Sequence, residues 1–422
     1  MATNIPAHPY TTATPVQRVS SWYLGALGLA QFGIFAAILT PVIVSMQLKA
    51  QEINPENPAA VVGLVLPIGA FGALIGNPIF GALSDRTRTR WGRRKPWLAG
   101  GIIGLLLGLV WISFSTSVPM LVVAWLVSQL ASNAASAALV ASFADNVPEE
   151  QRGRASSILA LAQNVSVLGG VYGAVYLVNN LPILFIVPGL VGVAAVAVYV
   201  FVTPDRLPEI EPRQFSFGRL LGTFWTNPIK YPDFGLAWWS RFLITFASYM
   251  FTTYRLLYME DHLHLPTQTA VAAVANGVGI YTAALLVGTV FSGWLSDKLR
   301  RRKIFVGGST FIFAIGLVVL AFANSVGHFY VAEAIMGFAF GIYAAVDTAL
   351  VIDVLPDRSK PGKDLGVLNI ANSLPQSIAP ALGLALLGLG ASAGDNYVAL
   401  VWGAGIIAVL GALIVIPIKG VR

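Results

Sequence analysis

The chain has 422 residues, of which 56% are hydrophobic and only 11% are charged. Soluble domains carry about 25% charged residues, so this composition excludes an ordinary soluble fold. The net charge of +7 does not indicate nucleic-acid binding, because the basic residues lie between apolar runs, where cytoplasmic lipid headgroups favour them. These features predict an all-α integral membrane protein.

The sequence shows no signature of an enzyme or of a bound cofactor. It has no P-loop of the form GxxxxGK[ST], so ATP-driven transport by this chain is not expected. Cysteine is absent, which excludes disulfides and thiolate metal sites. The four histidines are scattered and form no metal-ligand cluster. We therefore expect no catalytic residues, no metal and no cofactor.

Apolar runs long enough to cross a bilayer recur along the whole chain. A helix needs about 20 apolar residues to cross the hydrocarbon. In chain order, the predicted spans are 21–46, 59–84, 97–116, 118–144, 153–178, 181–203, 234–258, 271–297, 303–323, 327–353, 364–389 and 394–417. The polar N-terminal segment before the first span shows no cleavable signal, so this span is expected to stay as an anchor.

The connection 204–233 is the longest and divides the spans six and six. It carries five prolines, and its apolar residues between Phe215 and Trp225 predict a short interfacial helix. We therefore predict an N-terminal six-helix bundle at 1–203, a cytoplasmic linker at 204–233 and a C-terminal six-helix bundle at 234–422.

The positions of lysine and arginine predict the topology. Of 26 such residues, only Lys49, Arg241 and Arg255 fall outside the segments that would be cytoplasmic if both termini were inside. Cytoplasmic loops carry an excess of Lys and Arg. The chain is therefore expected to be a multi-pass protein of the cell membrane with both termini in the cytoplasm.

Matched landmarks relate the two halves of the sequence. Gly81–Arg86 closes the second span, and Gly293–Lys298 closes the eighth. Asp145-Asn-Val-Pro148 closes the fourth span, and Asp353-Val-Leu-Pro356 closes the tenth. The second copy of each landmark follows the first at nearly the same interval. Repeated halves with a binding site between them are a frequent transporter design.

The loop after the second span resembles the signature loop of the major facilitator superfamily. The match consists of Gly81–Arg86 followed by Gly92-Arg-Arg-Lys95, with a degenerate copy at Gly293–Lys303. The resemblance covers essentially the whole chain and implies two six-helix bundles related by a pseudo-two-fold axis. It also implies alternating access to a central site lined by spans one, four, seven and ten.

Three segments are similar to the sucrose–proton and glycoside–cation symporter branch of that superfamily. They are Leu39-Thr-Pro41, Ser84-Asp-Arg with Trp91-Gly-Arg-Arg-Lys-Pro96, and Gly366-Val-Leu-Asn-Ile with Pro375-Gln376. This resemblance implies a sugar or glycoside that is carried with protons. The sucrose symporters place an arginine in span four where this chain has Val140, so the sugar-contacting arginine of that branch is missing here.

Four ionisable residues fall inside predicted spans, where charges are costly and mark functional sites. Arg241 and Arg255 lie in span seven, and Glu333 and Asp347 lie in span ten at the same spacing. This spacing is about four helical turns, so each helix presents nearly the same face again, about 21 Å along its axis. Because the two spans run in opposite directions, we expect ion pairs Arg241–Asp347 and Arg255–Glu333. Protonation of the acids would couple proton entry to transport; alternatively, the pairs only fix helix packing.

Uncharged polar and aromatic side chains inside the spans are the candidate substrate contacts. Amides both donate and accept hydrogen bonds, which suits hydroxyl-rich ligands, and aromatic rings offer a sugar ring an apolar face. Alternatively, each amide only bonds to a neighbouring helix. The candidates are Gln31, Trp125, Gln129, Asn133, Gln163, Asn164, Tyr249, Tyr254, Asn276, Asn369, Asn372 and Gln376.

The signature loops predict a gate at the cytoplasmic face. Acidic residues at helix ends can pair with neighbouring bases or with a helix dipole, and the resemblance implies a latch that holds this face shut in the outward-open state. Alternatively, the basic residues only set the topology. Asp145 is expected beside Arg152 and Arg154. The gate candidates are Gly81, Asp85, Arg86, Gly92, Arg93, Arg94, Asp145, Arg152, Arg154, Gly293, Asp297, Lys298 and Asp353.

Together these features predict a monomeric secondary transporter, a symporter that carries a sugar or glycoside with protons by alternating access. Its expected partners are the small-molecule substrate and the lipid bilayer, without nucleic acid. Sodium is the alternative coupling ion. One alternative function is a proton-coupled exporter of drugs or amphiphiles, against which the amide-rich interior argues. Another is a non-transporting receptor or scaffold.

Overall fold

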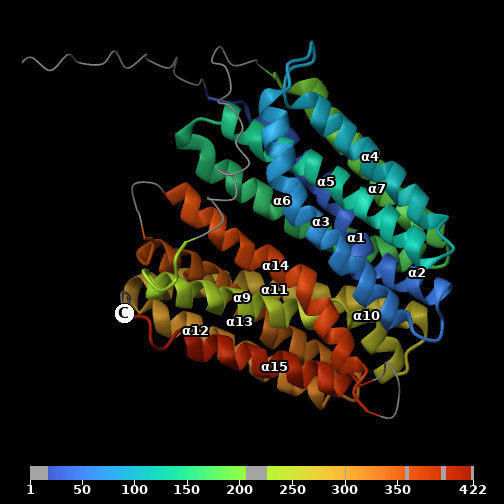
Figure 1. Cartoon of the computed structure of the whole chain (residues 1–422), viewed down its shortest axis with the longest axis vertical. Helices are drawn as coiled ribbons and strands as arrows, with labels where there is room; N and C mark the ends of the chain where they lie inside the picture. The colour runs from blue at the N-terminus through green and yellow to red at the C-terminus, as the bar shows by residue number, and fades with distance from the viewer. Residues whose placement is uncertain (1–17, 206–225, 300, 357–360, 391–395, 420–422) are drawn as a thin grey trace, which may run out of the picture.

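The computed structural model describes residues 18–205, 226–299, 301–356, 361–390 and 396–419, apart from a few side chains within them. These residues form helices, and their one isolated β-bridge joins Thr89 and Gly92. The helices form two groups, α1 to α7 and α9 to α15, which lie side by side (Figure 1). The predicted all-α fold with two helical bundles is therefore confirmed.

The N-terminal bundle begins with one long run of helix that changes its winding partway. Its elements are α1 (Ser21–Thr40), the π-helical turn η1 (Pro41–Ser45), α2 (Met46–Ile53), α3 (Pro58–Arg86), α4 (Lys95–Ser113), α5 (Val118–Asn146), α6 (Glu149–Leu177) and α7 (Leu181–Val202). Pro41 opens η1, and proline cannot supply the backbone donor that a regular helix needs. Asparagine side chains cap the N-termini of α3 and α7. Asn57 accepts a hydrogen bond from the amide of Ala60, and Asn180 accepts one from the amide of Ile183.

The C-terminal bundle repeats this order with a break in its first span. Its elements are α9 (Pro232–Thr252), α10 (Arg255–Leu257), the π-helical turn η2 (Tyr258–His262), α11 (Thr267–Leu299), α12 (Arg302–Ala321), α13 (Val326–Asp353), α14 (Pro361–Leu387) and α15 (Tyr397–Ile414). Single π-helical turns are frequent at functional sites, and here each half carries one after its first long helix.

Eleven helices within the described residues are long and apolar enough to cross a membrane. They agree with eleven of the twelve predicted spans. The seventh span consists of α9 and α10, and its main helix α9 is 21 residues long and carries Arg241. The interfacial helix predicted between Phe215 and Trp225 lies outside the described residues.

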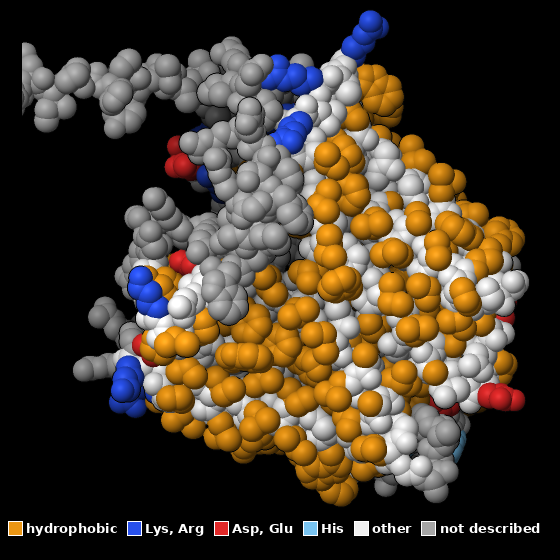
Figure 2. Space-filling model, viewed as in Figure 1, with side chains coloured by type: hydrophobic (Ala, Val, Ile, Leu, Met, Phe, Trp, Pro, Cys, Tyr) orange, Lys and Arg blue, Asp and Glu red, His pale blue; other side chains and the backbone are white. Residues whose placement is uncertain are grey.

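The surface divides into an apolar face and charged ends. Large apolar side chains such as Trp22, Tyr176 and Phe201 are exposed, and hydrophobic residues cover much of the visible face in Figure 2. Lysines and arginines gather at one end, which we call the basic end and define by the loops 86–95 and 301–303. The opposite end carries α2, α10 and η2 (Figure 1). An apolar face between charged ends is the arrangement that a bilayer requires.

The two bundles repeat one packing plan with a constant offset in residue number. α5 begins at Val118 and α13 at Val326. A Cβ added to Gly69 would lie 2.2 Å from the indole nitrogen of Trp125, and one added to Gly277 would lie 3.4 Å from Cγ of Glu333. Gly277 follows Gly69, and Glu333 follows Trp125, by the same number of residues that separates the starts of α5 and α13. Trp125 and Glu333 therefore occupy matching positions in the repeat, although the side chain nearest to Gly277 is the ring of Phe329, 2.4 Å from the added Cβ.

The second and eighth spans differ in length. This difference explains why the interval between the motifs Gly81–Arg86 and Gly293–Lys298 is longer than the common offset. α3 has 29 residues and α11 has 33. Gly69 and Gly277 keep the common offset, whereas Gly293 lies beyond the position that the offset from Gly81 would give. The extra residues of α11, about one helical turn, therefore lie between Gly277 and Gly293.

Helices α11 and α13 touch through their backbones. A Cβ added to Gly341 would lie 2.1 Å from the carbonyl oxygen of Leu285, and one added to Gly337 would lie 2.3 Å from that of Tyr281. Small residues allow such close approach between membrane helices. The glycines therefore set how closely α13, which carries Glu333 and Asp347, packs on its neighbour.

We expect Gly341→Ala to destabilise the protein by about 1–3 kcal/mol, because a backbone carbonyl cannot move aside as a side chain can. The matched control is Gly308→Ala on α12, where an added Cβ meets no atom within 4 Å. Thermal unfolding of the two purified variants measures the difference. Equal unfolding temperatures would show that the close contact is not needed.

Candidate functional site

A buried ion pair joins α9 to α13 in the half of the bundle nearer the basic end. The Nε of Arg241 donates to Oδ2 of Asp347 at 2.7 Å, and Nη2 donates to the same oxygen. The two side chains are only 13% and 3% exposed. The pair that the sequence predicts at this depth is therefore present.

The carboxylate of Asp347 also interacts with the hydroxyl of Tyr343, one helical turn earlier on α13. Its buried Oδ1 lacks the geometry of a full hydrogen bond to any described residue. The buried hydroxyl of Tyr343 interacts with Asp347 and Arg241 but likewise lacks that geometry. Buried polar atoms are normally paired, and an unpaired one costs about 1–3 kcal/mol. Such an atom is the place on this carboxylate where a proton can add.

A second ion pair lies toward the opposite end of the same two spans. The Nε of Arg255 lies 3.0 Å from Oε1 of Glu333, and Nη2 donates to Oε2 at 3.4 Å. The first contact lacks the geometry of a hydrogen bond, so Nε of Arg255 and Oε1 of Glu333 are buried without a hydrogen bond to a described residue. The guanidinium also lies 5.6 Å from the ring centre of Phe251. Both predicted pairs therefore form, the outer one with the poorer geometry.

The break in span seven exposes backbone amides, which a residue of span one binds. α9 ends at Thr252 and helix resumes at Arg255. The N–H groups of Leu256 and Leu257 both donate to Oε1 of Gln47 at 3.1 Å. Gln47 lies on α2 and is fully buried. We call this contact between the two halves the Gln47 latch.

Further hydrogen bonds join the two halves around this latch. Gln51 donates to the carboxylate of Glu260. The hydroxyl of Tyr172 donates to Asn276 at 3.3 Å, and Gln268 donates to the carbonyl of Val175 at 3.1 Å. All these contacts lie toward the end opposite the basic loops, where α2 and α10 meet in Figure 1. They fasten the two bundles together at that end.

Glu260, which follows the seventh span at this end of the protein, has a raised pKa. Burial raises the pKa of the Glu260 carboxyl, although hydrogen bonds from Thr267 and Gln51 lower it. A carboxyl whose pKa is raised by burial binds its proton more tightly in the closed arrangement than in an open one. Acidification through that raised pKa therefore favours the closed form of this end.

The amide candidates lie along the helices, and two of them take part in small polar networks. Asn77 donates to Oδ1 of Asn133 at 3.3 Å. Asn276 accepts from Tyr172 and donates to the hydroxyl of Tyr330, each at 3.3 Å. Gln31 is buried on α1, and the candidates with exposed or half-buried side chains are Gln129, Gln163, Asn164, Tyr249, Asn369, Asn372 and Gln376.

Two aromatic candidates do not face a substrate path in this conformation. Trp125 and Tyr254 are fully buried. The indole of Trp125 fills the space opposite Gly69, and the hydroxyl of Tyr254 approaches Gly63 and donates to the carbonyl of Pro380 at 2.6 Å. A glycine on the facing helix lets each ring pack into a helix interface, and a role of the two rings in substrate binding stays a prediction.

Arg94 organises the basic end of the N-terminal bundle. Its guanidinium contacts Asp85 at 2.5 Å, the hydroxyl of Ser84 at 2.6 Å and Asp145 at 3.0 Å. Arg93 also pairs with Asp145, at 2.7 Å. Arg94 is almost completely buried, and a buried charge needs partners of this kind.

The C-terminal bundle contains a copy of this contact. Arg302 donates to Asp353, and the two are 51 residues apart, as Arg94 and Asp145 are. Arg302 also donates to the carbonyl of Ala349 at 3.1 Å. The basic ends of both halves are therefore tied by the same Arg–Asp pair, which follows the common offset of the repeat.

The partners predicted for Asp145 are wrong. Arg152 lies 3.6 Å from Glu149 and donates to the carbonyl of Val147, and Arg154 is exposed. Both arginines lie on α6, which starts after the turn that follows Asp145. The carboxylate instead faces the loop before α4, where Arg93 and Arg94 lie.

The remaining gate candidates lie at the surface of the basic end. Arg86 and Lys298 are exposed, and a Cβ added to Gly81 or Gly293 would meet no atom within 4 Å. The side chain of Asp297 lies outside the described residues.

Asp205, which no sequence pattern indicates, caps the N-terminus of helix α4 from the end of span six. Its Oδ2 accepts from the backbone amides of Arg94 at 2.7 Å and Lys95 at 2.9 Å. Gly92 adopts φ of +102°, and a Cβ there would lie 2.3 Å from this carboxylate. Glycine reaches that backbone conformation without strain. Pro204 before Asp205 marks the end of span six, but nothing in the sequence indicates its partner.

Comparison with known proteins identifies relatives along the whole chain. The profile of the Major Facilitator Superfamily matches residues 22–280 and 271–420. An uncharacterized symporter (sll1374) of Synechocystis is 58% identical over 78 residues, which make up 18% of this chain and 14% of that protein. The inner membrane transport protein YajR of Escherichia coli is 23% identical over 88% of this chain and 78% of its own length.

A solved structure shows the same fold. That of the nucleoside transporter NupG matches with a TM-score of 0.76 over 94% of this chain and 99% of that one. The two sequences are 11% identical, so this likeness concerns the fold alone.

We expect Gln47→Leu to open the end that the latch closes, because it leaves two buried amides unsatisfied at about 1–3 kcal/mol each. The natural chain has no cysteine, so spin labels at Glu56→Cys and Thr269→Cys, both exposed, report the distance between the halves. That distance should lengthen or broaden in the variant.

The control for this measurement is Gln151→Leu, which removes a hydrogen bond to Val19 within one half. It should leave the distance between the labels unchanged. A Gln47→Leu protein with the same distance distribution as this control would contradict the latch.

Proposed function

The chain belongs to the Major Facilitator Superfamily, and from this we propose that it is a symporter that moves a neutral polar solute, a sugar or a glycoside, together with protons. Family membership makes it a multi-pass membrane transporter. The proposal concerns its cargo, its coupling ion and the residues that serve them. The observation that carries the coupling is the buried Oδ1 of Asp347, which lacks the geometry of a full hydrogen bond to any described residue.

Proton binding at Asp347 would change what Arg241 contacts. Arg241 directs both of its hydrogen bonds to Oδ2, so a proton can add at Oδ1 without breaking them first. The added proton cancels the carboxylate charge and weakens its hold on the guanidinium. An arginine left unpaired inside the bundle is costly, and substrate hydroxyl groups can accept hydrogen bonds from it. Proton and substrate then favour each other's binding, as a symporter requires.

The outer ion pair would connect a second protonation to the gate. Arg255 immediately precedes Leu256, whose amide is bound by Gln47. Protonation of Glu333 would release Arg255 at the break in span seven, next to the two amides that form the latch. We assign to this pair the coupling of proton binding to opening of the end opposite the basic loops.

The orientation expected from the basic loops places the closed end outside the cell. The described conformation is then inward-facing, with the Gln47 latch closed. In the outward-facing conformation we propose that the signature loops close the basic end. Asp85 and Arg94, which pair within one half here, are the residues that we assign to that closure.

The polar interior supports a neutral cargo. Asn133 in one half and Asn276 in the other each bond to uncharged neighbours. Amide groups offer both donors and acceptors, which suits the hydroxyls of a sugar. The four charged residues predicted inside spans all belong to the C-terminal half. In the N-terminal half the buried Lys49 is paired with Glu52 and donates to the carbonyl of Ser113, so we propose that this half offers the solute a neutral polar wall.

Uptake into proteoliposomes tests this proposal. Radiolabelled neutral sugars and glycosides are offered with a pH gradient, with a sodium gradient, and with neither. We expect one of these solutes to accumulate only when the pH gradient is present. Accumulation driven by sodium alone, or resistance to drugs without any sugar uptake, would contradict it.

The substitution Asp347→Asn removes the proposed proton site while keeping the size of the side chain. It should reduce uphill accumulation at least about tenfold, and exchange of the solute between the two sides should persist because it needs no net proton movement. The matched control is Glu56→Gln, an exposed acid at the opposite end. Full accumulation by Asp347→Asn would exclude Asp347 as the coupling residue.

A further inference from the structure

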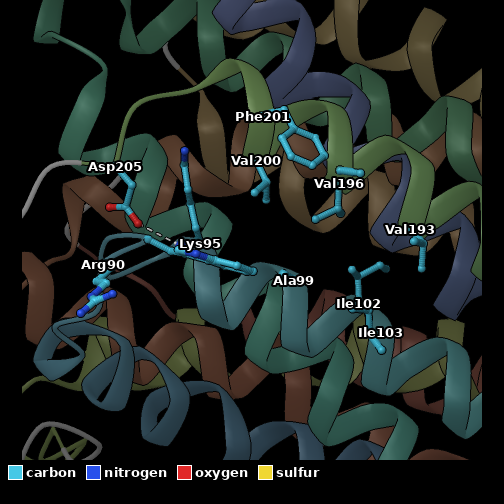
Figure 3. Close-up of a pocket in the computed structure, with 12 residues that line it drawn as sticks. Arg90, Lys95, Ala99, Ile102, Ile103, Val193, Val196, Val200, Phe201 and Asp205 are labelled. Carbon is cyan, nitrogen blue, oxygen red and sulfur yellow. Dashed lines mark hydrogen bonds between the residues drawn. The ribbon is translucent and has the colours of Figure 1, made fainter.

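A groove lies on the outer side of the N-terminal bundle, between α4 and α7, at the basic end. Its volume is about 520 Å³. The inner sides of its two walls are occupied, because α4 packs on α5 and α7 packs on α1. Ile103 of α4 and Phe201 of α7, which line the groove (Figure 3), are exposed, so the groove opens on the outer surface of the bundle.

The walls of the groove are apolar over much of their length. They are formed by Ala99, Ile102 and Ile103 from α4 and by Val193, Val196 and Val200 from α7. From Lys95 at the rim to Ile103, α4 rises about 12 Å. The groove therefore runs from the level of the lipid headgroups into the hydrocarbon layer.

The rim of the groove is basic. Arg90 and Lys95 line it (Figure 3), together with the exposed side chain of Trp91. Neither basic side chain forms an ion pair with a described residue. Two cationic side chains therefore lie at the rim of an apolar groove, and neither is paired with an acidic residue that the structure describes.

Asp205 also lines the groove but does not neutralise this rim. Its Oδ2 accepts hydrogen bonds from the amides of Arg94 and Lys95, and it lies at the positive end of the α4 dipole. The negative charge of Asp205 therefore stabilises the N-terminus of α4. Arg90 and the ammonium group of Lys95 remain available to an anion.

We propose that this groove binds one anionic phospholipid of the leaflet that faces the basic end. The phosphate group contacts Arg90 and Lys95, one acyl chain follows the walls of α4 and α7, and Trp91 lies at the interface, where tryptophan is enriched. Basic pockets between membrane helices at the cytoplasmic side suit anionic headgroups. The site is separate from the ion pairs of α9 and α13 and does not depend on the identity of the cargo.

Native mass spectrometry of the full-length protein tests the site, with dioleoyl-phosphatidylglycerol as probe and dioleoyl-phosphatidylcholine as its neutral counterpart. The unaltered protein should bind the anionic lipid more tightly. In Arg90→Gln/Lys95→Gln this affinity should fall about thirtyfold, since each basic side chain near a membrane surface contributes about fivefold. The control, Arg88→Gln/Lys230→Gln, loses the same charge at exposed positions outside the groove and should bind as the unaltered protein does.

A second variant separates the groove from the charge. Ala99→Phe fills the groove and leaves Arg90 and Lys95 in place. This variant should also bind the anionic lipid more weakly than the unaltered protein does. Glycerophosphoglycerol, which has the headgroup without acyl chains, should not displace the lipid. The proposal is overturned if the two charge variants bind alike, if the neutral lipid binds as tightly as the anionic one, or if the free headgroup competes.

Discussion

The ion pair between Arg241 and the buried Asp347, in which one carboxylate oxygen accepts both hydrogen bonds, sets the main constraint on this protein. Removing either partner would leave a buried charge, which costs several kcal/mol. An apolar cluster that includes Phe234, Ile244, Val346 and Leu350 lies on the same two helices. Neutralising the aspartate weakens its hold on the arginine, and a proton is the simplest agent that can do so.

The repeat separates two kinds of charged contact. At the position that Trp125 occupies in the N-terminal half, the C-terminal half has Glu333, and the ring of Phe329 packs nearest to Gly277 there. The charge of Glu333 is therefore confined to one half of the repeat. The Arg–Asp pairs at the basic end, by contrast, occur in both halves at the same spacing. Shared contacts support the architecture, and the contacts confined to one half are the better candidates for coupling.

Hydropathy and spacing predicted the spans and both buried ion pairs, because helix periodicity alone relates Arg241 to Arg255 and Glu333 to Asp347. The latch could not be predicted, since the partners of Gln47 are backbone amides that become available only where α9 breaks. The packing of Trp125 could not be predicted either, because the direction of a ring depends on the glycine that faces it. Arg152 is nearer in sequence to Asp145 than Arg94 is, yet the fold brings Arg94 to the carboxylate.

In the proposed mechanism, Asp347 gains and loses a proton as the protein works. Infrared difference spectroscopy between acidic and neutral pH measures this directly, because a protonated carboxyl absorbs apart from a carboxylate. We predict a carboxyl band that is present in the unaltered protein and absent in Asp347→Asn. The same band with the same intensity in both proteins would contradict this role for Asp347.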